Sequence, residues 1–525
     1  MHKRFVLSLA RIVFFPALCL VFSSPLTAGP GPVSAFDAMK ARPVEVASKA
    51  RASAPGALFR IVGLRGAEGE PLTLDLETAP LFTANFHLYI DGQDRGKDAV
   101  ARLTLLRGTV EEWPRSSVAL TVNSATGAWS GFLADGDRFY EVTIPAGAAD
   151  ASQGSIAKSA VVSRTAFEPL AKNSHLSDAL APPAAFGEKA GSLQTKIVPA
   201  PGADYQATLA LDSDYEFFQL FGDADAAAEY LAKIFGNVSE LYFRQLGVSL
   251  AISSISLYTT PDDPWNAPNP HSGATADVLC EFSSFWQSFR PVKNYPRNAA
   301  MFFTGKASND IGGQAWLFGL CNYAAKPSSC PYGGYGIVVA IRRLALDTNT
   351  TAHELGHIFG SIHTHCYEPP IDQCFGGEDG CYSGPESVPP GGGSVMSYCS
   401  PSNFSMGEAG KYGLDSERVE AAIRDLVDAV GATCMVRTSD PFELAATPAT
   451  GKATLSWIDP FSTESNWLVE QLQSNGKFKQ VKSLPANATG VTITGLRHGS
   501  TYSFRVRAKI KKDFSVYSDV VTVKP

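Results

Sequence analysis

Residues 353–363 read His-Glu-Leu-Gly-His-Ile-Phe-Gly-Ser-Ile-His, and this stretch decides how the middle of the chain folds. His353 and His357 are four residues apart, so on a helix both side chains project from one face, one turn apart. Two such imidazoles can each give a nitrogen to a zinc ion at about 2.0–2.1 Å. Gly360 can end the helix, because glycine accepts the left-handed conformation, and the returning chain can supply His363 as a third ligand.

The carboxylate of Glu354 is the candidate general base. It lies one residue after His353, about 100° around the helix, beside the metal rather than bound to it. Three protein ligands leave one zinc position open, and zinc lowers the pKa of a bound water toward about 7. Glu354 would take a proton from that water and pass it to the leaving amine. The alternative is a buried helix with hydrogen-bonded histidines, which the fixed offsets of five residues argue against.

The run resembles the HExxHxxGxxH motif of the metzincin zinc peptidases, in which a methionine turn follows later. Residues 393–398 read Gly-Ser-Val-Met-Ser-Tyr and resemble that turn. The resemblance implies that Met396 packs beneath the metal site without binding the metal. Tyr398 matches a tyrosine that approaches the zinc or the developing oxyanion in the serralysin and astacin branches. A tyrosine that only packs or hydrogen-bonds is the alternative, and both interpretations stay open here.

The resemblance therefore implies a complete site around one catalytic Zn²⁺. No motif indicates Ca²⁺. The implied metal ligands are His353, His357 and His363, the catalytic residues are Glu354 and Tyr398, and the supporting residues are Met396 and Gly360.

Residues 312–321 resemble the edge strand of the reprolysin branch, which includes the ADAM and snake-venom enzymes. In that branch the edge strand pairs with extended substrate. Thr364 departs from the branch, where an aspartate usually follows the third histidine. His365 we interpret as a loop residue. Residues 401–404 are a candidate lining for the pocket after the scissile bond, by analogy with the family.

The peptidase domain is predicted as a mixed α/β fold over residues 198–437, with a twisted mixed sheet and an active-site helix. Strands and helices interleave before the histidine motif. Helices are expected at 224–246 and 276–289. Strands are expected at 205–211, 248–257, 299–303, 314–320 and 336–341.

The first 28 residues are typical of a secretory signal peptide, with positive charge, then the apolar run 12–22, then a small-residue end at Ala28. No later segment reaches the length of apolar sequence that spans a bilayer. Residues 29–197 form a cysteine-free, β-rich region that weakly resembles reprolysin propeptides, and its end is a linker open to processing. The chain is thus expected to be a zymogen, without the cysteine switch that some relatives use.

The chain has nine cysteines, and removing Cys19 of the signal peptide leaves eight. An even number in an exported chain indicates four disulfides, here confined to residues 280–434. Spacing makes Cys321–Cys330 and Cys374–Cys381 plausible, without establishing either pair.

Residues 438–525 resemble a fibronectin type III module, an all-β sandwich of about seven strands. Trp457 matches the core tryptophan of an early strand, and Leu496 with Tyr502 has the spacing of a tyrosine corner. Such modules act as spacers or adhesion elements. An extracellular matrix or cell-surface ligand is therefore an expected partner of this module.

Charge and composition are those of an ordinary soluble globular protein. The net charge of −7 argues against a nucleic-acid binder, and 45% hydrophobic with 18% charged residues is ordinary for a globular protein. The leading prediction is a zinc endopeptidase acting on proteins or peptides outside the cell, with periplasmic transit or cell-surface association allowed. The alternative is an adhesion or matrix-binding protein with a silent peptidase domain. The retained Glu354 favours the enzyme, because degenerate relatives usually lose that residue.

Overall fold

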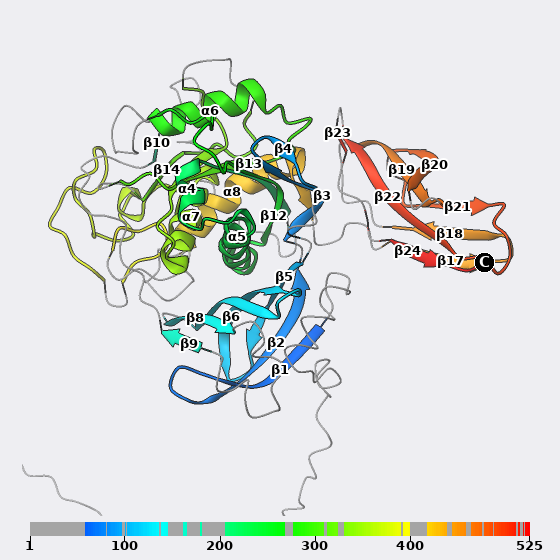
Figure 1. Cartoon of the computed structure of the whole chain (residues 1–525), viewed down its shortest axis with the longest axis horizontal. Helices are drawn as coiled ribbons and strands as arrows, with labels where there is room; N and C mark the ends of the chain where they lie inside the picture. Colours follow the sequence, from blue (N-terminus) through cyan, green and yellow to red (C-terminus); the bar gives the residue numbers. More distant parts are fainter. Residues whose placement is uncertain are drawn as a thin grey trace, which may run out of the picture.

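The computed structural model describes residues 58–144, 161–164, 179–180, 205–399 and 417–525, with short internal gaps, the longest being 268–276, 324–329, 438–443 and 458–463. The predicted signal peptide, most of the linker and the candidate pocket residues 401–404 lie outside these ranges. The described strands form four sheets (Figure 1).

The central sheet is mixed and has nine strands, eight of them in the order β10-β14-β15-β13-β11-β12-β3-β4, with β16 against β11. All neighbours are parallel except β14 with β15, β3 with β4 and β11 with β16. The bounds are β3 (Phe82–Ile90), β4 (Gln93–Asp94), β10 (Ala179–Leu180), β11 (Tyr205–Ser213), β12 (Val248–Leu257), β13 (Ala299–Thr304), β14 (Gly313–Trp316), β15 (Tyr335–Val339) and β16 (Val436–Arg437).

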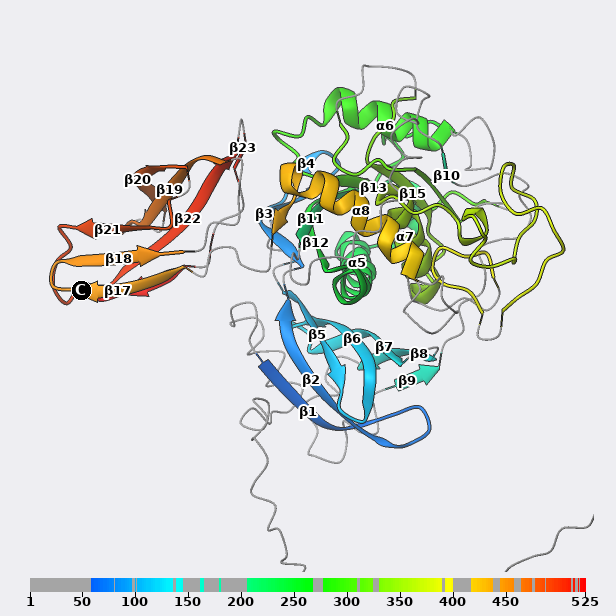
Figure 2. The same ribbon diagram turned by 180° about the vertical axis from the view of Figure 1, so that it is seen from behind.

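Helices cover both faces of this sheet, because its strands are apolar on both sides (Figures 1 and 2). Along β13, Met301 and Phe303 join the core shared with α5, α7 and α8, while Phe302 faces the core shared with α6. The helices are α4 (Tyr215–Gln219), α5 (Ala224–Leu246), α6 (Asp277–Phe289), α7 (Leu344–Ile358), α8 (Glu417–Cys434) and a 3-10 turn (Thr364–Cys366). None of the helices in the described ranges is long and apolar enough to cross a bilayer.

A second, antiparallel sheet comes from the N-terminal region and lies on the other side of α5 (Figure 2). Its residues Leu105, Ala119 and Phe132 belong to the same core as α5. Its strands are β1 (Leu58–Arg65), β2 (Pro71–Ala79), β5 (Leu103–Val110), β6 (Trp113–Asn123), β7 (Ala128–Asp135), β8 (Arg138–Ile144) and β9 (Val161–Arg164).

The N-terminal region also supplies both ends of the central sheet. The hairpin β3–β4 pairs with β12 at one end, and β10 pairs with β14 at the other. Sequence pattern assigns these strands to the predicted propeptide, yet they lie in the sheet of the predicted peptidase domain. Pattern alone could not show this, because pairing partners far apart in the chain leave no local signal.

The eight cysteines form four disulfides, as the sequence predicts: Cys280–Cys330, Cys321–Cys434, Cys366–Cys381 and Cys374–Cys399. Both pairings suggested by short spacing, Cys321–Cys330 and Cys374–Cys381, are wrong. The fold brings Cys321 to Cys434 at the end of α8, 113 residues away in the chain. It brings Cys330 to Cys280 on α6, 50 residues away. Sequence distance is therefore a poor guide to these pairs.

The C-terminal region is a β-sandwich whose core contains Trp457 and Trp467. The Arg497 backbone N–H donates to the Tyr502 hydroxyl at 2.8 Å, which is the bond of the predicted tyrosine corner. The strands are β17 (Ala445–Ala449), β18 (Lys452–Ser456) and β21 (Gly490–Thr494) in one sheet, and β19 (Glu464–Leu472), β20 (Phe478–Pro485), β22 (Tyr502–Ile510), β23 (Asp513–Phe514) and β24 (Val521–Val523) in the other.

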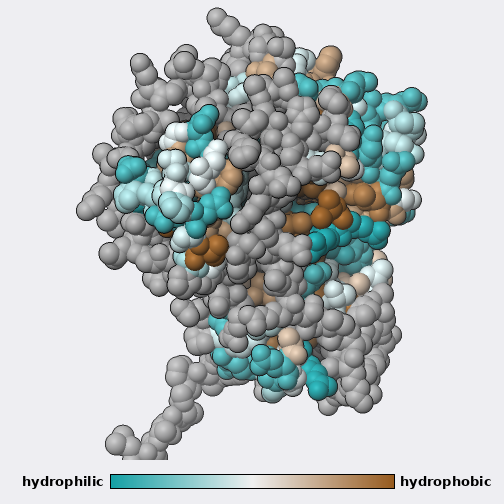
Figure 3. Space-filling view, turned by 90° about the vertical axis from the view of Figure 1, so that its left-hand side faces the viewer, coloured by the Kyte–Doolittle hydropathy of each residue, from teal (hydrophilic) through white to brown (hydrophobic). Residues whose placement is uncertain are grey.

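On the face shown in Figure 3, brown atoms gather in a band right of centre and in a smaller group on the left, beside teal atoms. Of the described residues, the large apolar side chains with the greatest exposure are Val62, Phe289 and Val520. Val62 is on β1, Phe289 ends α6 and Val520 precedes β24, so these three side chains come from separate parts of the described chain.

Candidate metal centre

Helix α7 and the turn after it bring the three predicted ligands together. His353, His357 and His363 are all fully buried. The His357 Nε2 atom lies 3.0 Å from Nε2 of His353 and 3.1 Å from Nε2 of His363. Gly360 follows the helix with φ +106° and allows the chain to turn back toward His363. The three rings thus converge through the same nitrogen.

The other ring nitrogens explain this convergence. Nδ1 of His353 lies 2.6 Å from the Val395 carbonyl oxygen, and Nδ1 of His357 lies 2.8 Å from that of Ser361. A carbonyl oxygen can only accept, so each Nδ1 donates its proton to it and the Nε2 atom of each ring points toward the other histidines.

The arrangement fits a zinc ion. Two nitrogens 2.0–2.1 Å from a tetrahedral zinc stand about 3.3 Å apart, close to the separations found here. All three nitrogens lie within 4.8 Å of one another. Buried imidazole nitrogens that face one another at such short range would repel without a proton or cation between them.

Glu354 reaches from helix α7 to the start of strand β14. It is fully buried on α7, and its carboxylate is against Gly313, the first residue of β14. A Cβ added to Gly313 would stand 2.7 Å from Cδ of Glu354, closer than carbon atoms approach. Gly313 is therefore required for this placement of the carboxylate, a role that pattern reasoning did not assign to it.

The methionine turn lies under the helix. Met396 is buried, and its sulfur is against Gly356, between the two helical histidines, where any Cβ would clash with it. The Thr364 backbone N–H and hydroxyl both donate to the Met396 carbonyl, at 3.1 and 3.3 Å. Thr364, the residue that replaces the usual aspartate, thus joins the third ligand's turn to the methionine turn.

Tyr398 packs on the metal ligands. Its ring centroid is 4.5 Å from that of His363, 5.3 Å from that of His365 and 6.1 Å from that of His353. The side chain is only partly buried. This position beside the three rings keeps both interpretations of Tyr398 open.

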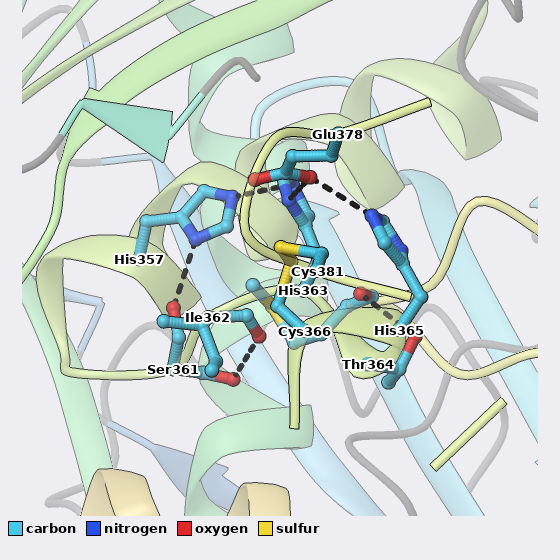
Figure 4. Close-up of a disulfide and its surroundings, with 10 residues drawn as sticks. His357, Ser361, Ile362, His363, Thr364, His365, Cys366, Glu378 and Cys381 are labelled. Carbon is cyan, nitrogen blue, oxygen red and sulfur yellow. Dashed lines mark hydrogen bonds and ion pairs between the residues drawn. A yellow bond between two sulfur atoms is a disulfide. The ribbon is translucent and has the colours of Figure 1, made fainter. Parts of the chain in front are cut away.

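Sequence reasoning missed Glu378. His365, predicted as a loop residue, lies buried in the 3-10 turn after the helix, and its Nε2 lies 2.8 Å from Glu378 Oε2. The same oxygen lies 2.8 Å from Nδ1 of His363 (Figure 4). Glu378 had no fixed spacing from the motif, so nothing in the sequence distinguished it from other loop carboxylates.

The carboxyl group of Glu378 is held ionised by these contacts. Burial acts to raise its pKa, but hydrogen bonds and attraction from His363 and His365 outweigh this, so its pKa lies well below the ordinary value.

Comparison with known proteins agrees with this geometry. Residues 203–406 match the model of Metallo-peptidase family M12, and residues 439–524 match that of the Fibronectin type III domain. Residues 203–406 form an M12 metallo-peptidase domain. The recognition of a metallopeptidase with a C-terminal fibronectin type III domain is confirmed. Replacement of the usual aspartate by Thr364 therefore does not take the M12 domain out of the family.

Relatives outside the family models are distant. The chain is 24% identical over 189 residues to the Disintegrin and metalloproteinase domain-containing protein B of Aspergillus fumigatus, covering 34% of this chain and 22% of that protein. It thus spans about a fifth of that relative's length.

Two solved structures resemble a short part of the chain. The fn3 domain of human collagen alpha-1(XX) chain is 23% identical, with 16% of this chain and 82% of that chain covered and a TM-score of 0.15. Chicken CNTN1 FN1-FN3 domains are 11% identical, with 16% and 30% covered and a TM-score of 0.15.

Proposed function

We propose that this protein is a secreted zinc-dependent endopeptidase that is synthesised as a zymogen, with His353, His357 and His363 as the metal ligands. One observation carries the proposal. Three buried Nε2 atoms converge at 3.0–3.1 Å, and the carboxylate of Glu354, on the same helix as two of these histidines, lies against Gly313 of strand β14.

Zinc bound there supplies a Lewis acid and a water of lowered pKa. Glu354 accepts the proton of the attacking water and passes it to the leaving amine. Strand β14 offers its edge to an extended substrate, so peptide backbone is held beside Glu354 without a demand for one side-chain sequence. In this proposal Met396 and Gly360 hold the ligands in place, and the Tyr398 hydroxyl donates to the oxyanion.

The zymogen proposal is supported by β10. Ala179 and Leu180 pair in parallel with Ala315 and Trp316 of β14. A substrate strand could not use this edge while β10 occupies it, because each backbone edge accepts one partner. The predicted propeptide thus covers the proposed substrate site by backbone pairing, without a cysteine.

Catalysis is tested with purified protein, its zinc content and a peptide library. Glu354→Ala is expected to retain zinc and to lower kcat/KM by at least about 10²-fold, because no base remains to accept the proton. Activity within tenfold of wild type would remove Glu354 from this role. A wild-type protein with neither zinc nor peptidase activity would favour the adhesion alternative, in which the fibronectin type III domain binds an extracellular ligand.

Latency is tested separately with Ala179→Pro in the uncut chain. Proline removes a backbone donor and disfavours strand pairing, so peptide hydrolysis is expected to rise severalfold. The same change in a Glu354→Gln background is the control and should give no activity. If Ala179→Pro leaves hydrolysis by the uncut chain unchanged, β10 does not cause latency.

A further inference from the structure

The third metal ligand is held differently from the first two. Nδ1 of His353 and of His357 each bond to a backbone carbonyl, which is neutral and fixed by the chain. Nδ1 of His363 bonds to a side-chain carboxylate, Glu378 Oε2, at 2.8 Å. The Glu378 carboxylate is charged, and because it is a side chain, a substitution can remove it while the backbone stays the same.

A second histidine holds that carboxylate in place. Nε2 of His365 donates to the same Oε2 atom, also at 2.8 Å, and the rings of His363 and His365 are parallel, 6° apart with centroids at 5.2 Å. Figure 4 shows Glu378 bridging the two rings. The side chain of Glu378 is 12% exposed and both imidazoles are 0% exposed. One oxygen therefore accepts two hydrogen bonds in a nearly dry environment.

The loop that carries Glu378 is fastened to the loop that carries the histidines. Cys366 and Cys381 form a disulfide across 15 residues, directly after His365 and shortly after Glu378. The Tyr382 backbone N–H also donates to the His365 carbonyl at 3.1 Å. These links keep the carboxylate within reach of both rings.

We propose that Glu378 is a positioning residue for His363, that His365 in turn orients Glu378, and that this pair sets how tightly the centre retains its metal. The inference rests on the proposed metal site and deepens it. A carboxylate acceptor fixes the tautomer of a ligating imidazole and raises its basicity, and loss of such a partner typically weakens metal affinity 10–100-fold.

Zinc affinity of the full chain, measured by competition with a chromophoric chelator, tests the proposal. Glu378→Ala should weaken zinc binding 10–100-fold and speed zinc loss, and Glu378→Gln should give a smaller loss, since an amide oxygen still accepts a hydrogen bond but carries no charge. His365→Phe keeps a ring but no donor and should also weaken binding. Glu386→Gln, an exposed carboxylate on the same loop, is the matched control and should leave affinity unchanged.

Cobalt(II)-loaded protein provides a readout that a merely structural role would not move. The visible ligand-field bands should shift in Glu378→Gln and stay unchanged in Glu386→Gln, because only the first change alters the charge behind His363. Far-UV circular dichroism checks that each variant is folded.

The two proposals fail differently. If wild-type protein binds zinc and cleaves peptides, yet folded Glu378→Gln and Glu378→Ala retain zinc affinity within threefold and show unshifted cobalt bands, this inference is overturned alone. If wild-type protein binds no zinc, the proposed function is overturned with it.

Discussion

Gly236 of α5 faces Thr121 of β6 so closely that a Cβ on the glycine would stand 2.9 Å from the Thr121 hydroxyl oxygen. Nearby, the Arg244 guanidinium donates to the Gly108 carbonyl at 2.9 Å. The Arg107 guanidinium lies 3.4 Å from the centre of the Phe243 ring. The N-terminal sheet is therefore closely packed on the helix that supports the central sheet.

Gly236→Val should destabilise this packing. Valine gains little in helix propensity over glycine, while overpacking costs about 1–3 kcal/mol. We expect the free energy of unfolding to fall by about 2 kcal/mol in urea titrations. The matched control is Thr121→Ala, which opens space: combined with Gly236→Val, it should recover part of the loss. Additive losses would show that the two positions do not meet.

Gly313→Ala should lower kcat without lowering the zinc content of the protein. The new methyl group would displace the Glu354 carboxylate, so we expect kcat to fall about 10²-fold while zinc content stays at one ion per chain. The measurement is peptide hydrolysis beside metal analysis. In a Glu354→Gln background, Gly313→Ala should cause no further loss. An equal extra loss there would mean that Gly313 acts independently of Glu354.

Tyr398→Phe separates the two interpretations of this ring. Phenylalanine keeps the packing against His363 but removes the hydroxyl. If the hydroxyl donates to the oxyanion, kcat should fall about 10²-fold with KM and zinc content nearly unchanged. That is the outcome we expect from steady-state kinetics. A kcat within threefold of wild type would assign Tyr398 to packing.

Asp212→Asn should change how stability depends on pH. Burial raises the pKa of Asp212 from 3.8 to about 7, and repulsion from Asp263 adds to this. Attraction from Arg290 and hydrogen bonds from Trp286 and the Ser213 backbone act in the opposite direction but are outweighed. The folded state thus holds a proton that the unfolded state releases within this range. Proton binding by Asp212 therefore adds to the free energy of unfolding. This addition is fully present below pH 3.8 and is lost as pH rises toward about 7, by at most about 1.4 kcal/mol per pH unit.

The variant cannot titrate, so its stability should lack this slope. Urea titrations at several pH values between 4 and 7, within the range given by those two pKa values, measure the difference. The free energy of unfolding of the wild type minus that of Asp212→Asn should decrease as pH rises. Glu386→Gln, exposed on a loop, should follow the wild-type slope. A constant difference between wild type and Asp212→Asn would mean that Asp212 does not titrate in this range.

Local pattern predicted much of the peptidase domain. The helix expected at 224–246 has those bounds in the structure, because one continuous apolar face and the cap residues Asp223 and Gly247 fix its ends. The strand expected at 248–257 is likewise found there. Spacing on one helix predicts that His353 and His357 meet, as they do, whereas the approach of His363 depends on the turn at Gly360 and was expected from the motif.

What depends on distant parts of the chain was not predicted. The disulfide Cys321–Cys434, the strand β3 beside β12 and the carboxylate Glu378 all reach their partners only after folding. The side chain that supports His363 sits on an irregular loop, where no periodicity marks it. The proposed role of Glu378 follows from its position in the folded structure, and its spacing from the histidine motif does not indicate it.

The two ends of the central sheet carry a consequence for maturation. Because β3 and β10 both precede residue 181, one cut in the linker before β11 would leave every strand pairing intact. Scission and activation then become separate events with separate rates. Activation then requires departure of the bound fragment, and by mass action dilution of the cut protein favours the dissociated state at equilibrium.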